Sequence, residues 1–451
     1  MIFTILNMSD DSNKGDLAII ESTIWLVKQY FPGTTINVLN VDYSTQEIQA
    51  EGKFKHLRKL PIMHHGSFFP RVFKEKRNLY ELLCGIKNFF LSLWILSVVF
   101  FLKKHSYFFI PKKHKKAFTA ILSADLIILK GGSYIYSYGG LKQSLFLYRM
   151  LFTTLLSIFL KKKIIVLGHS IGPVVGILPM KLAKFCLKRS NKIVVREKIS
   201  YDFVVQTLGI KEEKVELLPD IAFYWHKPLS GLERKDQVQK VFEKEGIKYS
   251  DLSKPRIGIT VREWNFPLQE NPEKLFKNYT NTIAEVIDAL FLNYGGEVFI
   301  MPHALADKTI GEEIATRARY KKPFVLKGDY STDVLRAIYG EMDLFIGTRT
   351  HSCIFALSSG VPVINIAYEI PKGFGITGMV EDQDYIIHIA KINKMVLLDR
   401  IYRILKKRQI RRDVILHKVS LMQEELKVNF LYLFNSVLGK KKLQVIEKGK
   451  A

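Results

Sequence analysis

The sequence predicts an α/β protein made of two doubly wound, Rossmann-like domains with a cleft between them. Short, continuously apolar runs recur along the chain, each ends in glycine or polar residues, and helical patterns separate them. Apolar strands of this kind are buried on both faces, as in parallel sheets, and their alternation with helices is typical of βαβ units. Strands are expected within residues 2–6, 125–132, 163–173, 192–200, 255–263, 296–304 and 344–347.

A polar, charge-rich stretch near the middle of the chain marks the expected domain boundary. It contains Pro228, Gly231 and Pro255. We predict an N-terminal domain at 1–225, a linker at 226–254, a C-terminal domain at 255–390 and a helical, basic tail at 391–451. Functional groups are expected at the carboxyl ends of the strands, where ligands of doubly wound sheets bind.

The composition limits the possible functions. The 451 residues are enough for two cores, and 48% hydrophobic residues exclude a disordered chain. The net charge of +25 favours anionic partners. The 3 cysteines form no CxxC pair, and no basic segment precedes the first strand, so we expect a protein of the reducing cytoplasm without a signal peptide.

Residues 53–116 differ from the rest of the chain. Residues 89–102 carry no charge, and as a helix they would span roughly 21 Å, less than the ~30 Å core of a bilayer. The following lysines are Lys103, Lys104, Lys112, Lys113, Lys115 and Lys116. One interpretation is an interfacial hairpin on an anionic membrane, and the other is a buried helix beside a solvated basic loop. The apolar run at 145–160 contains Arg149 and is expected in the core.

Glycine-rich turns follow several strands of the first half. Asn13 and Asp16 flank a turn into a helix, where free N–H groups bind anions, although Asp16 could simply cap the helix. Gly131 and Gly132 directly follow a strand and would let a ligand approach the backbone. In "GHSIGPV", Ser170 lies at another strand end, either as a binding group or as part of a rigid turn.

Arginine and histidine recur at strand ends. Arg196 and Arg262 each follow an apolar strand, where a guanidinium can grip phosphate or carboxylate, although Arg196 could instead pair with Glu197 or a nearby acid such as Asp220. His303 follows the strand near 298–300, with Asp307 placed to orient its ring. Arg349 and His351 follow the strand at 344–347. Arginines and histidines at neighbouring strand ends indicate an anionic substrate and a histidine that acts as an acid or base.

Several chemistries lack their signatures. The sequence has no HExxH and no clustered thiols, so no metal is expected, and no GxxxxGK[ST] for ATP hydrolysis. The basic residues flank apolar segments rather than a stacking-aromatic module, so nucleic acid is not an expected partner.

The order of these motifs resembles the polysaccharide pyruvyl transferase family over roughly residues 13–378. The resemblance rests on "NKGDLAI", "GGS", "GHSIGP", "VVREKIS", "LLPDIAF", "MPHA" and "GTRTHSCIFALSSGVPVINIAYEIPKGFG". Two departures are a glycine pair followed by Ser133 where the family often has three glycines, and the longer apolar, basic segment. The first leaves the contacts of that loop open, and the second suggests a membrane-bound acceptor.

The resemblance implies a glycosyltransferase-B-like fold and transfer of the carboxyvinyl group of phosphoenolpyruvate to a sugar. A pyruvate ketal would form and phosphate would leave, with no metal or organic cofactor. His303 or His351 would be the acid, with His303 preferred because Arg349 would hold His351 near the leaving group. The anion grips would be Arg349, Arg262, Arg196 and Lys372. Asn13 and Asp16 would hold the sugar from the N-terminal domain, and Gly131, Gly132 and Ser170 are further expected substrate contacts.

The expected partners are phosphoenolpyruvate, a glycan acceptor carried on a lipid, and the anionic inner face of the cell membrane. Two other functions stay open at this point. One is a glycosyltransferase-B enzyme that uses a nucleotide sugar, with Glu369 as a ribose contact. The other is a non-catalytic glycan- or lipid-binding protein at the membrane surface.

Overall fold

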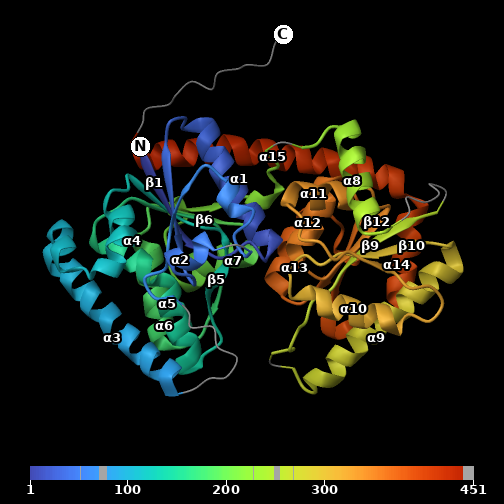
Figure 1. Ribbon diagram of the computed structural model, residues 1–451, viewed down its shortest axis with the longest axis horizontal. Helices are drawn as coiled ribbons and strands as arrows, with labels where there is room; N and C mark the ends of the chain where they lie inside the picture. Colours follow the sequence, from blue (N-terminus) through green and yellow to red (C-terminus); the bar gives the residue numbers. More distant parts are fainter. Residues whose placement is uncertain (51, 71–78, 227, 248–253, 268, 440–451) are drawn as a thin grey trace, which may run out of the picture. The chain divides into compact units, whose positions relative to one another are not determined.

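The computed structural model describes residues 1–50, 52–70, 79–226, 228–247, 254–267 and 269–439. The chain forms two compact units, each built on a parallel sheet covered by helices (Figure 1). The first unit comprises Met1–Asp11, Ile19–Leu218 and Glu425–Ala451, and the second comprises Ser12–Ala18 and Pro219–Glu424. The predicted fold class, two doubly wound α/β units, is confirmed.

The sheet of the first unit has the strand order β3-β2-β1-β4-β6-β7-β8, with β5 paired to β6, and its ladders are parallel. The strands are β1 (Ile2–Met8), β2 (Thr35–Asn40), β3 (Met63–His65), β4 (Leu126–Leu129), β5 (Gly132–Ser137), β6 (Ile164–Val174), β7 (Lys192–Val195) and β8 (Val215–Leu217). The helices are α1 (Lys14–Tyr30), α2 (Thr45–Gln49), α3 (Leu79–Leu102), α4 (Lys112–Leu122), α5 (Gly140–Phe159), α6 (Ile177–Arg189) and α7 (Lys198–Asp202).

The sheet of the second unit has the order β11-β10-β9-β12-β13-β14, which is the 3-2-1-4-5-6 order of a Rossmann sheet. The strands are β9 (Arg256–Thr260), β10 (Glu297–Ile300), β11 (Phe324–Val325), β12 (Leu344–Gly347), β13 (Val363–Ala367) and β14 (Ile386–His388). The helices are α8 (Gly231–Lys244), α9 (Pro272–Tyr294), α10 (Asp307–Arg317), α11 (Thr332–Gly340), α12 (Thr350–Ser358), α13 (Ile370–Ile376), α14 (Lys394–Lys406) and α15 (Arg408–Leu438).

The division of the chain differs from the predicted one. Residues 226–254, predicted as a linker, contain α8, whose start carries a capping box between Ser230 and Glu233. Phe242 of α8 is buried and stacks on Phe299 of β10 with ring centroids 5.4 Å apart. Helix α8 therefore belongs to the second unit, to which it supplies apolar side chains, and residues 227 and 248–253 lie outside the described residues.

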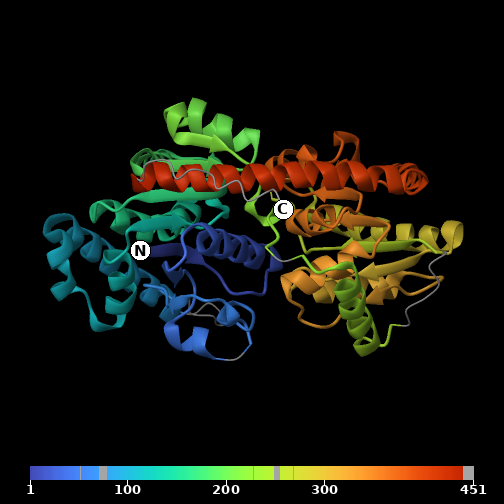
Figure 2. The same cartoon turned by 90° about the horizontal axis from the view of Figure 1, so that it is seen from above.

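The C-terminal segment, predicted as a tail, is a structural element of both units. Figure 2 shows α15, in red, as one long helix. Its residues 408–424 belong to the second unit and its residues 425–438 to the first. In the first unit Phe434 packs its ring against Phe3 and Phe31 at 6.0 and 5.8 Å. The basic end of the chain from residue 440 lies outside the described residues.

Helix α3 is longer than the uncharged run that predicted it. It begins at Leu79, ten residues before that run, and its 24 residues span about 36 Å. Among the described residues, Leu83–Phe109 is the stretch that is long and apolar enough to cross a membrane, and only 22% of its most apolar window is buried. The expectation for residues 145–160 is confirmed, because α5 buries Leu147, Leu151 and Leu156 in the core.

Candidate active site

The central strands of the second unit, β9 and β12, bring two of the predicted cations to neighbouring strand ends. They pair in parallel with Thr260 opposite Gly347. Arg262 and Arg349 each lie two residues beyond this pair, so both leave the same edge of the sheet from strands about 4.8 Å apart. This edge is the topological switch point of the sheet, where ligands of doubly wound folds bind.

Tyr279 of α9 ties the two strand ends together. Its hydroxyl lies 2.9 Å from the Thr348 hydroxyl after β12 and accepts a hydrogen bond from the backbone N–H of Arg262 at 3.4 Å. The Thr348 N–H also donates to the Thr260 carbonyl at 3.1 Å, which extends the ladder by one step. The backbones that carry the two arginines are therefore held in register.

Arg349 makes a bidentate ion pair. Its Nε and Nη2 donate to the two carboxylate oxygens of Asp307, each at 2.6 Å, and Asp307 is 1% exposed at the start of α10. Asp307 also accepts the backbone N–H of Ala304 at 2.9 Å. Burial works against the charge of Arg349, but the pair with Asp307 raises its pKa above the usual value. The pair uses two of the five N–H donors of the guanidinium.

His351 lies in the first turn of α12, partly exposed. Its Nε2 is 3.6 Å from a carboxylate oxygen of Asp220, a distance within ion-pair range but beyond a hydrogen bond. Asp220 is itself fixed, because it is buried and accepts the Ala222 N–H at 2.9 Å as a helix cap. Asp220 can therefore compensate the positive charge of a protonated His351 ring.

The first turn of α1 packs against the His351 ring. A Cβ atom added to Gly15 would lie 2.4 Å from Cγ and Nδ1 of His351, so only glycine fits at this position. The turn is held by backbone contacts on its other side: Asn13 bridges to Ala304, and the Lys14 N–H donates to the His303 carbonyl at 3.1 Å.

Asn13 and Asp16, predicted in the N-terminal domain, therefore belong to the second unit. The Asn13 amide donates to the Asp16 carboxylate at 2.9 Å, and its carbonyl oxygen accepts the Gly15 N–H at 3.1 Å. The prediction placed them with the first strand because Asn13 follows Met8, the last residue of β1, by only five positions. The chain crosses to the second unit at Ser12 and returns within α1.

His303 has surroundings unlike those of His351. Its side chain is buried, its Nδ1 lies 3.3 Å from the Tyr339 hydroxyl, and its ring meets Phe355 edge to face at 4.9 Å. Burial, followed by the charges of His351 and Arg349, lowers the pKa of His303 well below its ordinary value. Asp307, expected to orient this ring, pairs with Arg349 instead. His303 is thus a neutral ring packed under the site.

Arg262 is held by aromatic rings. Its guanidinium lies 4.0 Å from the centroid of Tyr368 and 4.9 Å from that of Trp264, and its Nε donates to the Glu263 carbonyl at 3.3 Å. The contacts described for Arg262 are thus with rings and backbone rather than with a carboxylate. A cation on aromatic faces keeps its charge available to a ligand.

Lys372 pairs with Glu369 across the first turn of α13. Both were expected in ligand contacts, Lys372 for an anion and Glu369 for a ribose. Each instead neutralises the other in this structure, so Arg262 is the better candidate for an uncompensated cation.

The remaining predicted residues belong to the first unit. Arg196 is buried at the end of β7 and donates to Ser170 of β6 at 2.9 Å. Close packing explains the glycine at position 131, because an added Cβ would lie 2.9 Å from the carbonyl oxygens of Leu167 and Gly168. Gly132 pairs with His169 in the β5–β6 ladder. These residues brace the strand ends of the first unit.

Sequence reasoning did not assign roles to Gly15 and Asp220 in this site. Gly15 is visible in the sequence only as one glycine of a turn, and its contact with His351 depends on the tertiary fold. The sequence offered Asp220 only as a possible partner of Arg196, and the structure places one of its carboxylate oxygens 3.6 Å from Nε2 of His351.

The fold defines a glycosyltransferase-B-like α/β protein, and two arginines follow neighbouring strand ends in its second unit. Among solved structures, a glycosyltransferase from Rickettsia africae is similar with a TM-score of 0.55 and 13% identity, covering 98% of this chain and 99% of that one. Anabaena HepE, solved in complex with UDP-glucose, is similar with a TM-score of 0.55 and 11% identity, covering 98% and 100%. At these identities the likeness establishes the fold alone.

The sequence model of the polysaccharide pyruvyl transferase family matches residues 13–370, and the chain belongs to that family. The amylovoran biosynthesis protein AmsJ of Erwinia amylovora is 25% identical over 288 residues. The match covers 60% of this chain and 65% of AmsJ, so it spans slightly less than two thirds of that relative. The predicted family is thereby confirmed.

Proposed function

We propose that this protein transfers the pyruvyl group of phosphoenolpyruvate to two hydroxyls of a polysaccharide sugar, forming a ketal and releasing phosphate. One observation carries the proposal. Arg262 and Arg349 follow paired positions of two neighbouring strands at the switch point of the second unit, and His351 lies two residues after Arg349. Phosphoenolpyruvate carries a phosphate and a carboxylate on the same carbon, and two arginines that follow neighbouring strand ends suit such a pair of anionic groups.

In the proposed reaction, His351 donates a proton to the methylene carbon of phosphoenolpyruvate. The positive charge that develops on the neighbouring carbon is captured by a sugar hydroxyl, whose proton restores the acid. The bond from that carbon to the phosphate oxygen then breaks, a second hydroxyl closes the ketal, and its proton leaves with phosphate. Asp220 compensates the charge of the protonated ring before transfer.

His351 is the better acid of the two histidines, which reverses the preference drawn from the sequence. His303 is buried, and burial lowers its pKa, which disfavours the protonated, cationic ring that an acid needs. His351 faces a fixed carboxylate and keeps partial exposure. We expect His351→Gln to abolish turnover and His303→Gln to retain a measurable rate. The opposite ranking would reverse the assignment.

Phosphate release from phosphoenolpyruvate in the presence of glycan acceptors tests the donor. The expected result is stoichiometric phosphate release that depends on both substrates. A parallel reaction with nucleotide sugars is the counter-test, since nucleotide release without phosphate release from phosphoenolpyruvate would refute the proposal.

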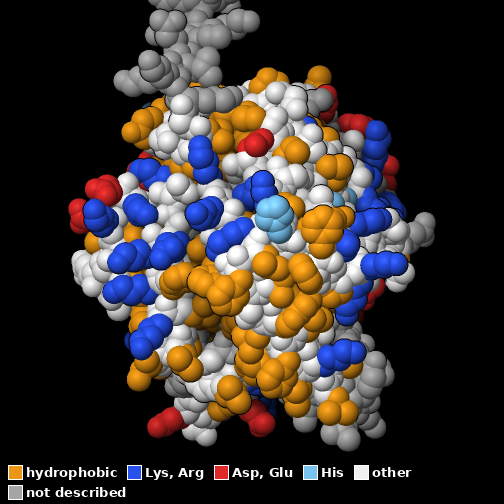
Figure 3. Space-filling model, turned by 90° about the vertical axis from the view of Figure 1, so that its left-hand side faces the viewer, with side chains coloured by type: hydrophobic (Ala, Val, Ile, Leu, Met, Phe, Trp, Pro, Cys, Tyr) orange, Lys and Arg blue, Asp and Glu red, His pale blue; other side chains and the backbone are white. Residues whose placement is uncertain are grey.

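We also propose that the acceptor is carried on a lipid and that the protein works at an anionic membrane surface. Helix α3 supports this because both its faces are apolar. Ile95, Leu96 and Val99 face the core, while the opposite stripe of Leu83, Ile86, Phe90, Trp94 and Phe101 is exposed at helical spacing. Figure 3 shows hydrophobic side chains gathered on this face, with Lys and Arg side chains along one side.

The lysines match this membrane interpretation. Lys104, Lys112, Lys113 and Lys116 are exposed just after the apolar helix, and each basic residue near an anionic surface contributes about 1 kcal/mol. Because one face of α3 packs on the first unit, the helix would lie in the interface rather than cross the bilayer. Co-sedimentation with phosphatidylglycerol vesicles but not phosphatidylcholine vesicles is the expected result. If the protein sediments with neither kind of vesicle, the proposed membrane-binding role of α3 and its lysines is wrong.

A further inference from the structure

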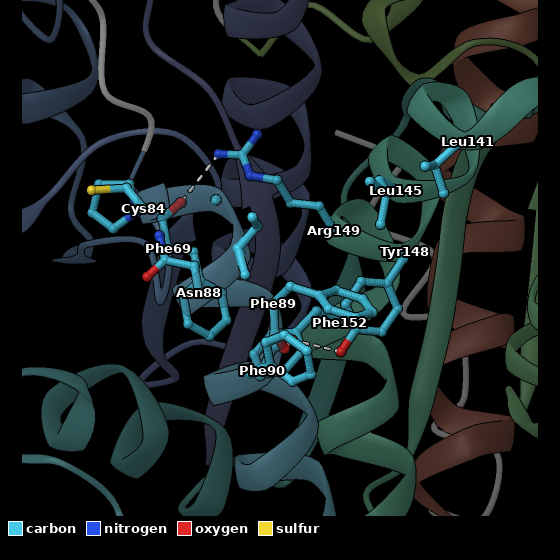
Figure 4. Close-up of a pocket in the computed structure, with 14 residues that line it drawn as sticks. Phe69, Cys84, Asn88, Phe89, Phe90, Leu141, Leu145, Tyr148, Arg149 and Phe152 are labelled. Carbon is cyan, nitrogen blue, oxygen red and sulfur yellow. Dashed lines mark hydrogen bonds between the residues drawn. The ribbon is translucent and has the colours of Figure 1, made fainter. Parts of the chain in front are cut away.

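A large apolar cavity lies in the first unit between the start of α3 and helix α5. Its volume is about 620 Å³, within the range of small-molecule sites. Its walls include Phe89 and Phe90 from α3, Leu145, Tyr148 and Phe152 from α5, and Phe69 from the preceding loop (Figure 4). The proposed catalytic residues lie in the other unit, so this cavity is separate from the pyruvyl-transfer site.

Three polar side chains in the wall already have partners. The Ser92 hydroxyl lies 2.7 Å from the Tyr148 hydroxyl, and Arg149 donates to the carbonyls of Val41 and Phe69 at 2.6 and 3.3 Å. Arg149 also pairs with Asp42 at 2.9 Å. In Figure 4, dashed lines mark hydrogen bonds that Arg149 and Tyr148 make with other residues of the wall. The wall therefore favours an apolar occupant, because most of its side chains are apolar and the Ser92, Tyr148 and Arg149 side chains are already paired.

The cavity is continuous with the apolar face of α3. Phe90 and Ile86 belong both to its wall and to the exposed stripe of that helix, and Phe90 is 64% exposed. On the other side, Leu141 of α5 is 76% exposed. A molecule entering from a bilayer against α3 would reach the cavity without crossing a polar surface, and it would cover these side chains.

We propose that this cavity binds the hydrocarbon chain of the lipid that carries the acceptor glycan. The inference rests on the proposed function, and it adds a chain-binding site that separates lipid-linked from free glycans. Each methylene taken out of water contributes roughly a fourfold gain in affinity, so even a few buried carbons would raise the preference for a lipid-linked acceptor strongly.

Cys84 provides a readout that does not depend on catalysis. It lines the cavity and is half-buried, whereas the other two cysteines, Cys186 and Cys353, are buried. Farnesyl phosphate serves as the probe chain and inorganic phosphate as its headgroup control. We expect farnesyl phosphate to slow alkylation of Cys84 by N-ethylmaleimide at least tenfold and inorganic phosphate to leave it unchanged. An unchanged rate with farnesyl phosphate would overturn the site.

Gly85→Trp tests the cavity in the working enzyme. A Cβ at Gly85 meets no atom within 4 Å, so an indole can grow into open space beside Cys84. Ser97→Trp is the matched control, since it adds an indole to an exposed position of the same helix away from the cavity. We expect Gly85→Trp to raise KM at least tenfold for a lipid-linked glycan and to leave the free glycan unaffected. Ser97→Trp should change neither.

The outcomes separate this inference from the proposed function. Phosphate release with the free glycan reports on pyruvyl transfer alone, so its absence would refute that reaction while Cys84 protection still tests the cavity. If the wild type shows equal KM values for the lipid-linked and the free glycan while farnesyl phosphate still protects Cys84, the cavity binds membrane lipid in general. That result would overturn the proposal that the cavity binds the acceptor's chain.

Discussion

Replacing Gly15 with alanine should displace His351. The added methyl carbon would begin 2.4 Å from Cγ and Nδ1 of the ring and 2.6 Å from its Cβ. Non-bonded carbon atoms prefer about 3.5–4.0 Å, so the ring or the first turn of α1 must move by about 1–1.5 Å. The turn is held by the Asn13–Ala304 bridge and the Lys14 hydrogen bond, so the ring is the part that moves.

A displacement of that size has two measurable consequences. A misplacement of about 1 Å at a catalytic group costs about a hundredfold in rate, so kcat for phosphate release should fall about 10²-fold. Overpacking of a filled site costs about 1–3 kcal/mol, which denaturant unfolding would detect. The first readout depends on the proposed role of His351, and the second depends only on the contact.

Gly231→Ala is the control for this prediction. Gly231 begins helix α8 of the same unit, and a Cβ there meets no atom within 4 Å. The control should keep wild-type kcat and change stability by no more than about 1 kcal/mol, in the stabilising direction. Wild-type kcat and stability in Gly15→Ala would refute the packing argument, and lost stability with wild-type kcat would refute the role of His351.

Two further predictions concern charge and pH. Arg349→Met should destabilise the protein by about 3–5 kcal/mol because it leaves the buried Asp307 carboxylate unpaired, and adding Asp307→Asn should recover part of the loss in a double-mutant cycle; additive effects would contradict the pairing. His114 is stacked on Phe68, and burial, followed by the charge of Lys113, lowers its pKa to about 4. The unfolded chain takes up this proton near pH 6.5 and the folded one only near pH 4, so stability should be full above pH 6.5 and fall by about 3 kcal/mol between pH 6.5 and 4. His114→Leu should flatten that part of the pH profile, and an unaltered slope would show that other groups cause it.

The sheets could be predicted because their strands are continuously apolar. β4, β6, β9, β10 and β12 all appear in the sequence as short apolar runs that end in glycine or polar residues. β11 has two residues and β14 three, and segments that short carry no pattern of their own. Their strand conformation follows from pairing with β10 and β13, which only the folded sheet supplies.

The site was predictable in part for a related reason. Parallel strands end at the same edge, so residues just beyond β9 and β12 had to lie near one another, and Arg262 and Arg349 do. Their partners were not predictable. The Arg349–Asp307 pair joins residues 42 positions apart, and the choice between His303 and Arg349 as partner of Asp307 depends on side-chain geometry.

The residues around Asn13 and Asp16 in the sequence could not predict to which unit these two residues belong. Nothing near these residues indicates that the chain leaves the first unit after Asp11 and returns at Ile19. The crossing is stabilised by the bridge from Asn13 to Ala304, whose residues are far apart in sequence. A prediction from neighbours along the chain therefore places them with β1.

The mass of the acceptor glycan after incubation with phosphoenolpyruvate tests the central claim most directly. Mass spectrometry of lipid-linked glycans should show a gain equal to pyruvate less one water, in the wild type and not in His351→Gln. Glycans of unchanged mass with phosphoenolpyruvate, together with a gain of one sugar when nucleotide sugars are supplied, would contradict pyruvyl transfer.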